Sequence, residues 1–175
     1  MFALSRLTPI AAITVFACAT PGAVIERKPV AKPLGGYASA ALVMAAADPS
    51  ATNAAQKVSA CRGAFESQLN AAGVFASVLS EEQQAQVALV VKASFVDQTQ
   101  SVLGVEEKHK KIQVTVDFID TADQSTVGSV EVLGTSETGS TTSVGGVDTD
   151  AYADLYGRAC QVAAEQLGNY VKTKK

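Results

Sequence analysis

Two stretches of this sequence alternate in polarity, and that alternation constrains the fold more than any other feature. The first runs from Val87 to Val96 and the second from Ile112 to Phe118, each with one wholly apolar face. Successive side chains of a β-strand point to opposite faces, so each stretch predicts a strand with one buried face. The polar turn 120–125 leads into a third run, 126–133, and together they predict an antiparallel hairpin.

Two helical patterns flank these strands in the sequence. In the first, Ser50 or Thr52 is placed to cap a helix that Gly73 ends. Its apolar residues recur every three or four positions, at Ala54, Val58, Cys61, Phe65, Leu69 and Ala72. The second pattern starts at Asp148 or Thr149, and its apolar stripe consists of Tyr156, Cys160, Ala163, Leu167 and Tyr170. Because each helix has a single stripe, the expected fold is a two-layer α+β domain, a meandering and mostly antiparallel sheet with both helices packed on one face.

Weaker patterns complete the expected domain. Residues 37–47 lie between a Gly-Gly pair and Asp48-Pro49 and predict a buried strand, and residues 74–79 predict a short one. The stretch 134–146, rich in Ser, Thr and Gly, is typical of a loop. A chain of 175 residues accommodates one such domain, which we place at residues 37–175.

The N-terminal segment, residues 1–19, has the layout of a bacterial signal peptide, with Arg6, a short apolar run and small residues at its end. Val15–Cys18 resembles a lipobox, in which Cys18 becomes the lipidated first residue, whereas 17–19 also fits ordinary signal peptidase. The proline-containing stretch 20–36 predicts an extended tether, which favours the anchored form. By resemblance to known lipoprotein sorting, Ala19 after the cysteine implies the periplasmic side of the outer membrane. A soluble periplasmic protein is the alternative.

Two cysteines remain once Cys18 is removed or lipidated. Cys61 and Cys160 each lie in the middle of a helix stripe, in a compartment that oxidises thiols. The sequence predicts a disulfide between the two helices, and the alternative is a pair of buried thiols that pack as small apolar residues. No Cys-x-x-Cys pair is present, which argues against redox catalysis.

Residue types that carry chemistry are scarce. The one histidine, His109, lies in the charged run 106–111, which predicts a solvated loop because neighbouring lysines would repel a metal ion. Asp117, Asp120 and Asp123 lack the spacing of a calcium loop, and we expect turn aspartates to bond to their own backbone. No nucleophile elbow or phosphate-binding loop is present, so we expect no catalytic residue, no metal and no cofactor. A formal charge of −3 argues against nucleic acid as a partner.

The run from Phe65 to Phe75, with the strand that ends Phe95-Val96-Asp97, resembles a family of small bacterial envelope lipoproteins of unknown function. The later hairpin ending 130–136, the Gly-rich loop and the Ala-rich last helix extend this resemblance over residues 37–171. It implies a fold similar to the amino-terminal domain of the periplasmic protein TolB and to auxiliary lipoproteins of envelope transport systems. It implies no catalytic residue.

Three classes of function follow. We favour a non-enzymatic envelope (lipo)protein that acts as an accessory or assembly factor by contacting other envelope proteins, with the membrane reached through a lipid on Cys18. A periplasmic module for a small molecule or glycan is the alternative, against which the few aromatic residues and the missing tryptophan argue. A hydrolase, the third class, needs a convergent polar set that the sequence does not show. If both helices cover one sheet face, Val90, Lys92 and Val96 lie on the other and are the predicted partner contacts. The alternative is an ordinary solvated sheet face with scattered valines.

Overall fold

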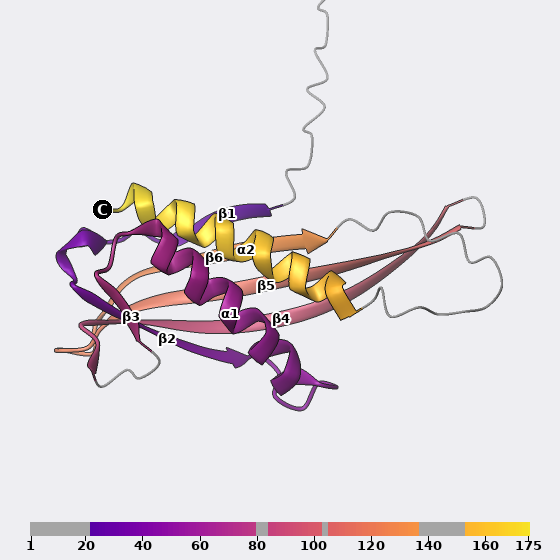
Figure 1. Cartoon of the computed structure of the whole chain (residues 1–175), viewed down its shortest axis with the longest axis horizontal. Helices are drawn as coiled ribbons and strands as arrows, with labels where there is room; N and C mark the ends of the chain where they lie inside the picture. The colour runs from indigo at the N-terminus through magenta and orange to yellow at the C-terminus, as the bar shows by residue number, and fades with distance from the viewer. Residues whose placement is uncertain (1–21, 80–83, 103–104, 137–152) are drawn as a thin grey trace, which may run out of the picture.

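The structure is a computed structural model of the chain, and it describes residues 22–79, 84–102, 105–136 and 153–175. These residues form one sheet and two long helices (Figure 1). The strands are β1 (Gly22–Lys28), β2 (Ser39–Ala46), β3 (Ser77–Leu79), β4 (Val87–Val102), β5 (Val105–Asp120) and β6 (Thr126–Ser136). The helices are α1 (Ala54–Ala72) and α2 (Ala153–Thr173), with a short 3-10 turn, η1, at Leu34–Gly36.

The six strands pair in the order β1-β6-β5-β4-β2-β3. Strands β1, β6, β5 and β4 are antiparallel neighbours, whereas β2 runs parallel to both β4 and β3. The parallel pairs arise because the chain leaves β2 through α1 and crosses over the sheet before it returns. The expected α+β fold with two helices on a sheet is therefore confirmed, as a mixed sheet.

Both helices cover the same face of the sheet, with α2 over β6 and β5 and α1 beside it (Figure 1). They run in the same direction, since Cys61 meets Cys160 and, further along, a Cβ built on Gly168 would lie 3.2 Å from the carbonyl oxygen of Gln68. The core between the two layers is apolar, and its largest fully buried side chains include Phe65, Leu69, Leu89, Val116, Phe118 and Leu167. The apolar stripes expected from the sequence are the surfaces that face this core.

A pair of glycines lets α2 lie close to the sheet. Gly22 of β1 and Gly134 of β6 are opposite each other in the register. A Cβ added at Gly134 would lie 2.9 Å from the Cβ of Ala163 and closer still to the backbone oxygen of Ala159. At Gly22 the added atom would lie 2.7 Å from Cγ of Gln166. A side chain at Gly134 would therefore push the helix away from the sheet, whereas at Gly22 the side chains of Gln166 and Val162 would have to move.

Strands β4 and β5 continue past the rest of the sheet as a two-stranded ribbon (Figure 1). Pairing of β2 with β4 ends at Ala93 and pairing of β6 with β5 ends at Lys110, whereas β4 and β5 stay in register to Val102 opposite Val105. We term this ribbon, residues 94–102 and 105–109, the arm. His109 lies in β5, so the loop predicted for it is wrong. Because the arm extends past the helices, its strands need no apolar face, and the alternation that marks the other strands is missing.

The predicted tether, residues 20–36, is wrong for the part that the structure describes. Gly22–Lys28 is an edge strand, β1, paired with β6, and residues 34–36 form η1. Of the three prolines that suggested a tether, Pro29 directly follows the strand and Pro33 directly precedes η1, so neither interrupts an element, and Pro21 lies outside the described residues. An edge strand needs backbone partners on one side only, so it carries little of the apolar signal of a central strand. The folded domain therefore begins before residue 37.

The first helix begins differently from its prediction. Neither Ser50 nor Thr52 caps α1; the residue before the helix is Asn53, in a left-handed conformation with φ of 57° and no capping bond from its side chain. Ser50 instead donates its N–H and its hydroxyl to the carboxylate of Asp48. Gly73 ends the helix in the left-handed conformation as expected. The predicted start of the second helix, at residues 148–149, lies outside the described residues.

Candidate interaction surface

The face of the sheet opposite α1 and α2, which we term the outer face, carries an apolar strip across β3, β2, β4 and β5. The register aligns Leu79, Ala41, Ala88 and Ile119 in one row and Val43 and Val90 in the next. None of these six residues belongs to the core cluster under the helices. The two alanines are fully buried, and the four larger side chains are half-buried. The apolar strip, defined by these six residues, therefore presents partly exposed aliphatic surface on the side away from the helices.

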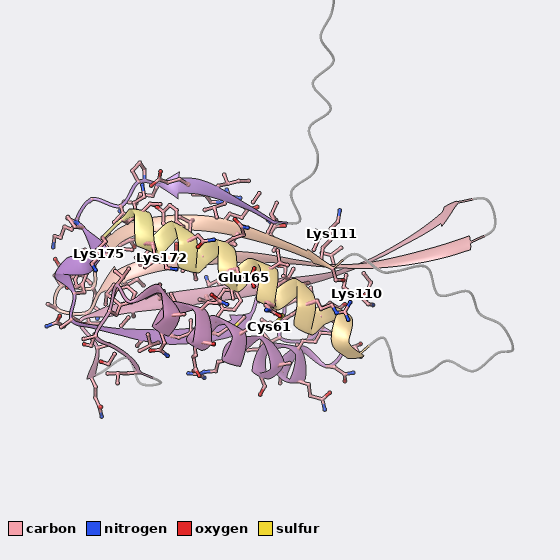
Figure 2. The ribbon with its side chains drawn as sticks, turned by 45° about the horizontal axis from the view of Figure 1, so that its top comes forward. Cys61, Lys110, Lys111, Glu165, Lys172 and Lys175 are labelled. Carbon is pink, nitrogen blue, oxygen red and sulfur yellow. A yellow bond between two sulfur atoms is a disulfide. The ribbon has the colours of Figure 1, made fainter. Side chains whose placement is uncertain are left out.

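The three predicted contact residues all lie on the outer face. Val90 belongs to the apolar strip, Lys92 is exposed opposite Thr115, and Val96 is 41% exposed opposite Lys111. Figure 2 shows Lys110 and Lys111 at the base of the arm, pointing to opposite sides, with Lys110 toward α2. Val96 therefore lies on the outer face at the point where the arm leaves the sheet, and Val90 lies on the same face within the apolar strip. Their role as partner contacts stays a prediction.

Next to the apolar strip, polar groups on the outer face are bonded to one another. Glu131 of β6 is only 5% exposed, although it lies on the outer face. Its carboxylate forms an ion pair with Arg27 of β1 and accepts a hydrogen bond of 2.7 Å from the Gln113 side chain. On the neighbouring row, Ser129 donates a hydrogen bond of 2.6 Å to Asp117. A partner that covers this half would bury no unpaired carboxylate of this set, which lowers the cost of desolvating it.

The sequence analysis missed this network because its ion pair depends on β1. Arg27 falls in the stretch expected to be a tether, so nothing in the sequence pointed to a cation opposite Glu131. The one available signal was Glu131 itself, a charged residue between Val130 and Val132 in a strand that is otherwise largely apolar.

The disulfide is confirmed between Cys61 of α1 and Cys160 of α2. Their Cα atoms are 5.2 Å apart, within the range that a disulfide requires, and both residues are fully buried. The bond lies between the helices, on the other side of the sheet from the apolar strip. It joins the two elements of the helical layer and takes no part in the outer face.

Three tyrosines donate hydrogen bonds to carboxylates on strands of the sheet. The pairs are Tyr37–Asp120 at 3.0 Å, Tyr170–Glu26 at 2.8 Å, and Tyr156–Asp97, and in each the phenol donates its hydrogen to the carboxylate. Burial and the neighbouring carboxylate raise the pKa of each phenol, that of Tyr37 to about 12. The pKa of Asp120 is lowered by hydrogen bonds from the N–H of Ala122 and from Tyr37. At neutral pH these phenols stay protonated and these carboxylates ionised, so the pairs act as fixed links between elements.

The acidic residues of the β5–β6 turn behave largely as expected. Asp120 accepts the N–H of Ala122 at 3.1 Å and Asp123 accepts that of Ser125 at 2.9 Å, which is the predicted turn bonding. Among the described residues, no group of His, Cys, Asp and Glu side chains has the number of ligands that a metal site requires. Nor does either helix, within the described part of the chain, have the length and hydropathy to span a bilayer.

A shallow pocket lies where α1 begins, next to the base of the arm. It has a volume of about 280 Å³ and is lined by Ala47, Asp48, Ala51, Ala54, Lys57, Ala93, Ser94 and Phe95. The ammonium of Lys57 lies 5.7 Å from the ring centre of Phe95 and 4.7 Å from that of Tyr156. This pocket offers an aromatic surface and a cation to a small ligand.

No family model and no curated protein matches this sequence. Among solved structures, the PelC dodecamer from Paraburkholderia phytofirmans matches with a TM-score of 0.51 and 18% identity, over 88% of this chain and 99% of that one. A minor lipoprotein from Acinetobacter baumannii matches with a TM-score of 0.46 and 14% identity, over 79% and 94% of the two chains. A PDZ domain protein from Parabacteroides distasonis has a TM-score of 0.43 and 10% identity, over 84% of this chain and 35% of that one. The comparisons assign no family, and what they show is that this chain has the fold of PelC.

Proposed function

We propose that this chain is a bacterial envelope protein that acts as an accessory or assembly factor by binding other envelope proteins, and that it catalyses no reaction. The apolar strip of the outer face is the observation that carries the proposal. It combines partly exposed aliphatic side chains with neighbouring polar groups that bond to one another, Glu131 to Arg27 and Gln113, and Asp117 to Ser129. An apolar centre beside bonded polar groups is the usual anatomy of a protein–protein interface.

The envelope location rests on two sequence features that lie outside the described residues, the signal-like segment 1–19 and Cys18. The shared fold adds support for protein contact, because the solved PelC is a dodecamer and this fold is therefore compatible with binding other chains. The proposed partners are other envelope proteins, and no nucleic acid is involved.

The lipid anchor has a direct test. Mass spectrometry of the mature amino terminus is expected to find a diacylglyceryl group on Cys18. Cys18→Ser is expected to move most of the protein from the membrane fraction to the periplasmic extract, because a single acyl attachment site is lost. A mature terminus that begins at Thr20 without modification would reject the anchor and leave a free periplasmic protein.

The contact surface is tested by capture of partners after crosslinking in intact cells. Val90→Glu and Val96→Glu each place a charge on the outer face, and we expect at least tenfold less recovery of a reproducible envelope partner, because a carboxylate would be buried unpaired in the contact. The thermal midpoint is expected to change by only a few degrees, since both side chains are partly exposed. Crosslinked products are identified by mass spectrometry.

Two control variants separate contact from fold and from catalysis. Ala60→Glu adds the same charge at an exposed position of α1 on the far side of the sheet and should leave recovery unchanged. His109→Ala should also have no effect. If both Val→Glu variants recover the partner as strongly as the natural protein does, the outer face is rejected as the contact surface. Loss of a measurable enzymatic activity in His109→Ala would contradict the non-enzymatic proposal.

A second candidate function is binding of a small molecule in the pocket at the start of α1. The ring of Phe95 beside the ammonium of Lys57 favours it. In that case Phe95→Ala would abolish ligand binding, and Val90→Glu would leave ligand binding intact. The contact proposal instead makes Val90→Glu the damaging substitution, because it lowers recovery of the partner.

A further inference from the structure

One edge of the arm presents backbone groups with no partner among the described residues. The carbonyl of Ala93 accepts the N–H of Ala47 at 2.8 Å, so the backbone of Ala93 points toward the β2 side. The register of β4 with β5 has no shift from Val87 to Val102. Alternate residues therefore present their N–H and C=O on that same side, namely Phe95, Asp97, Thr99 and Ser101. Pairing with β2 has ended by then, so in the described chain these groups form an open strand edge.

The two edges of the arm differ in the residues that could protect them. The β5 strand of the arm and its base carry five charges within six residues, at Glu106, Glu107, Lys108, Lys110 and Lys111. Between Gln98 and Val102, β4 has no charge and no proline. Charges, prolines and bulges are the devices by which proteins keep an edge from pairing with another chain. The β5 edge has such a device, whereas the β4 edge has only the charge of Asp97 at its base, which is paired with Lys110.

The base of the arm is held to the body of the protein. Asp97 forms an ion pair with Lys110 across the ribbon and accepts the hydroxyl hydrogen of Tyr156 from α2. The arm therefore leaves the body in a fixed direction. A two-stranded ribbon is only marginally stable in water when nothing pairs with its edges, and a further strand would stabilise it.

We propose that the β4 edge of the arm pairs with the same edge of a second copy of this chain, antiparallel and about a two-fold axis. Centred on Gln98, the pairing sets Phe95 opposite Ser101 and Asp97 opposite Thr99. The N–H and C=O groups of all four edge-facing residues then form hydrogen bonds with the other copy. The lone charge, Asp97, then faces a threonine and not its own copy, so the sequence of the edge is complementary to itself. This pairing goes beyond the proposed function, because it uses a different surface and a different partner.

A cysteine at the axis tests the register. In the full chain with Cys18→Ser, Gln98→Cys places two thiols opposite each other, with Cα atoms about 4.5–5.5 Å apart, close enough for a disulfide. Gln100→Cys is the matched control, because its two copies would be about 13 Å apart along the strands. Mild oxidation should link most of the Gln98→Cys protein into dimers on a non-reducing gel, at least tenfold more than Gln100→Cys. Equal linking of the two variants would overturn this register.

Sedimentation measures the association itself. The chain is expected to dimerise, and Thr99→Pro, which removes an edge-facing N–H without touching a bond to β5, should weaken dimerisation at least tenfold. Thr99→Ala keeps the backbone donor and should dimerise like the natural sequence. Thr99→Lys, which adds a charge to the edge with the backbone intact, should also weaken it and guards against a local effect of proline. The proposal is overturned if the chain is a monomer at all concentrations, or if neither Thr99→Pro nor Thr99→Lys weakens dimerisation. Either result would leave the separate proposal of partner capture through Val90 unaffected.

Discussion

Replacing both Cys61 and Cys160 by alanine is expected to lower the free energy of unfolding by about 2–5 kcal/mol. The two residues are 99 positions apart in sequence, so the disulfide closes a long loop and restricts the unfolded chain strongly. For a chain of this size the loss corresponds to a fall of roughly 10 °C in the thermal midpoint. Urea unfolding followed by circular dichroism measures it, provided the slope with urea is compared as well.

Reduction supplies the control for this prediction. Reductant added to the unfolded natural protein should reproduce the loss of stability, and it should have no effect on the double alanine variant. The double variant is preferred to a single one, because it leaves no buried free thiol that could form another bond. If the unfolding midpoints of the natural and double variant proteins coincide, the disulfide does not stabilise the fold.

Gly134→Ala is expected to destabilise the protein by about 1–3 kcal/mol, and Gly134→Val by more. The added Cβ would meet the backbone oxygen of Ala159 and the Cβ of Ala163, and backbone atoms of a packed helix cannot move aside as a flexible side chain can. Helix α2 would have to shift away from β6 and lose part of its contact with the core. The thermal midpoint and the urea midpoint both measure this change.

Gly63→Ala is the matched control for that substitution. Gly63 lies within α1, and a Cβ built there would have no heavy atom within 4 Å. The same chemical change should therefore stabilise the protein, by about 0.5–1 kcal/mol, through the better helix propensity of alanine. A loss of stability at Gly63 as large as at Gly134 would show that close packing of α2 on the sheet is not the cause.

The sequence was sufficient where an element has one face in the core. The stripe of α1, the alternation around Val91 and Val114, and the cysteines at matching stripe positions all reflect burial under the helical layer, and the fold class follows from them. Elements without a buried face were missed. Strand β1 pairs at an edge with most of its side chains exposed, and the arm extends beyond the helices, so neither has a pattern of polarity to read.

The candidate surface was predictable only in part. Val90, Lys92 and Val96 could be placed on the outer face because a strand alternates, and that depends on the sequence alone. The rest of the apolar strip comes from β2, β3 and β5, and which residues stand beside Val90 depends on the order and register of strands. Val43 meets Val90 because β2 is parallel to β4, a pairing that a meander would not produce. Long-range pairing of this kind leaves no local signal.

The position of β1 determines how closely an anchored domain would be held to its membrane. If Cys18 carries a lipid, only three residues lie between it and Gly22, where pairing with Gly134 begins, and the four residue steps from Cys18 to Gly22 span at most about 14 Å. Gly134 is two residues from Ser136, which pairs with Lys110 at the base of the arm. The bilayer would therefore lie near the end of the molecule from which the arm projects. Such a short connection between the lipid and β1 leaves the domain little freedom to reorient. Any partner would therefore have to approach within a few nanometres of the lipid headgroups.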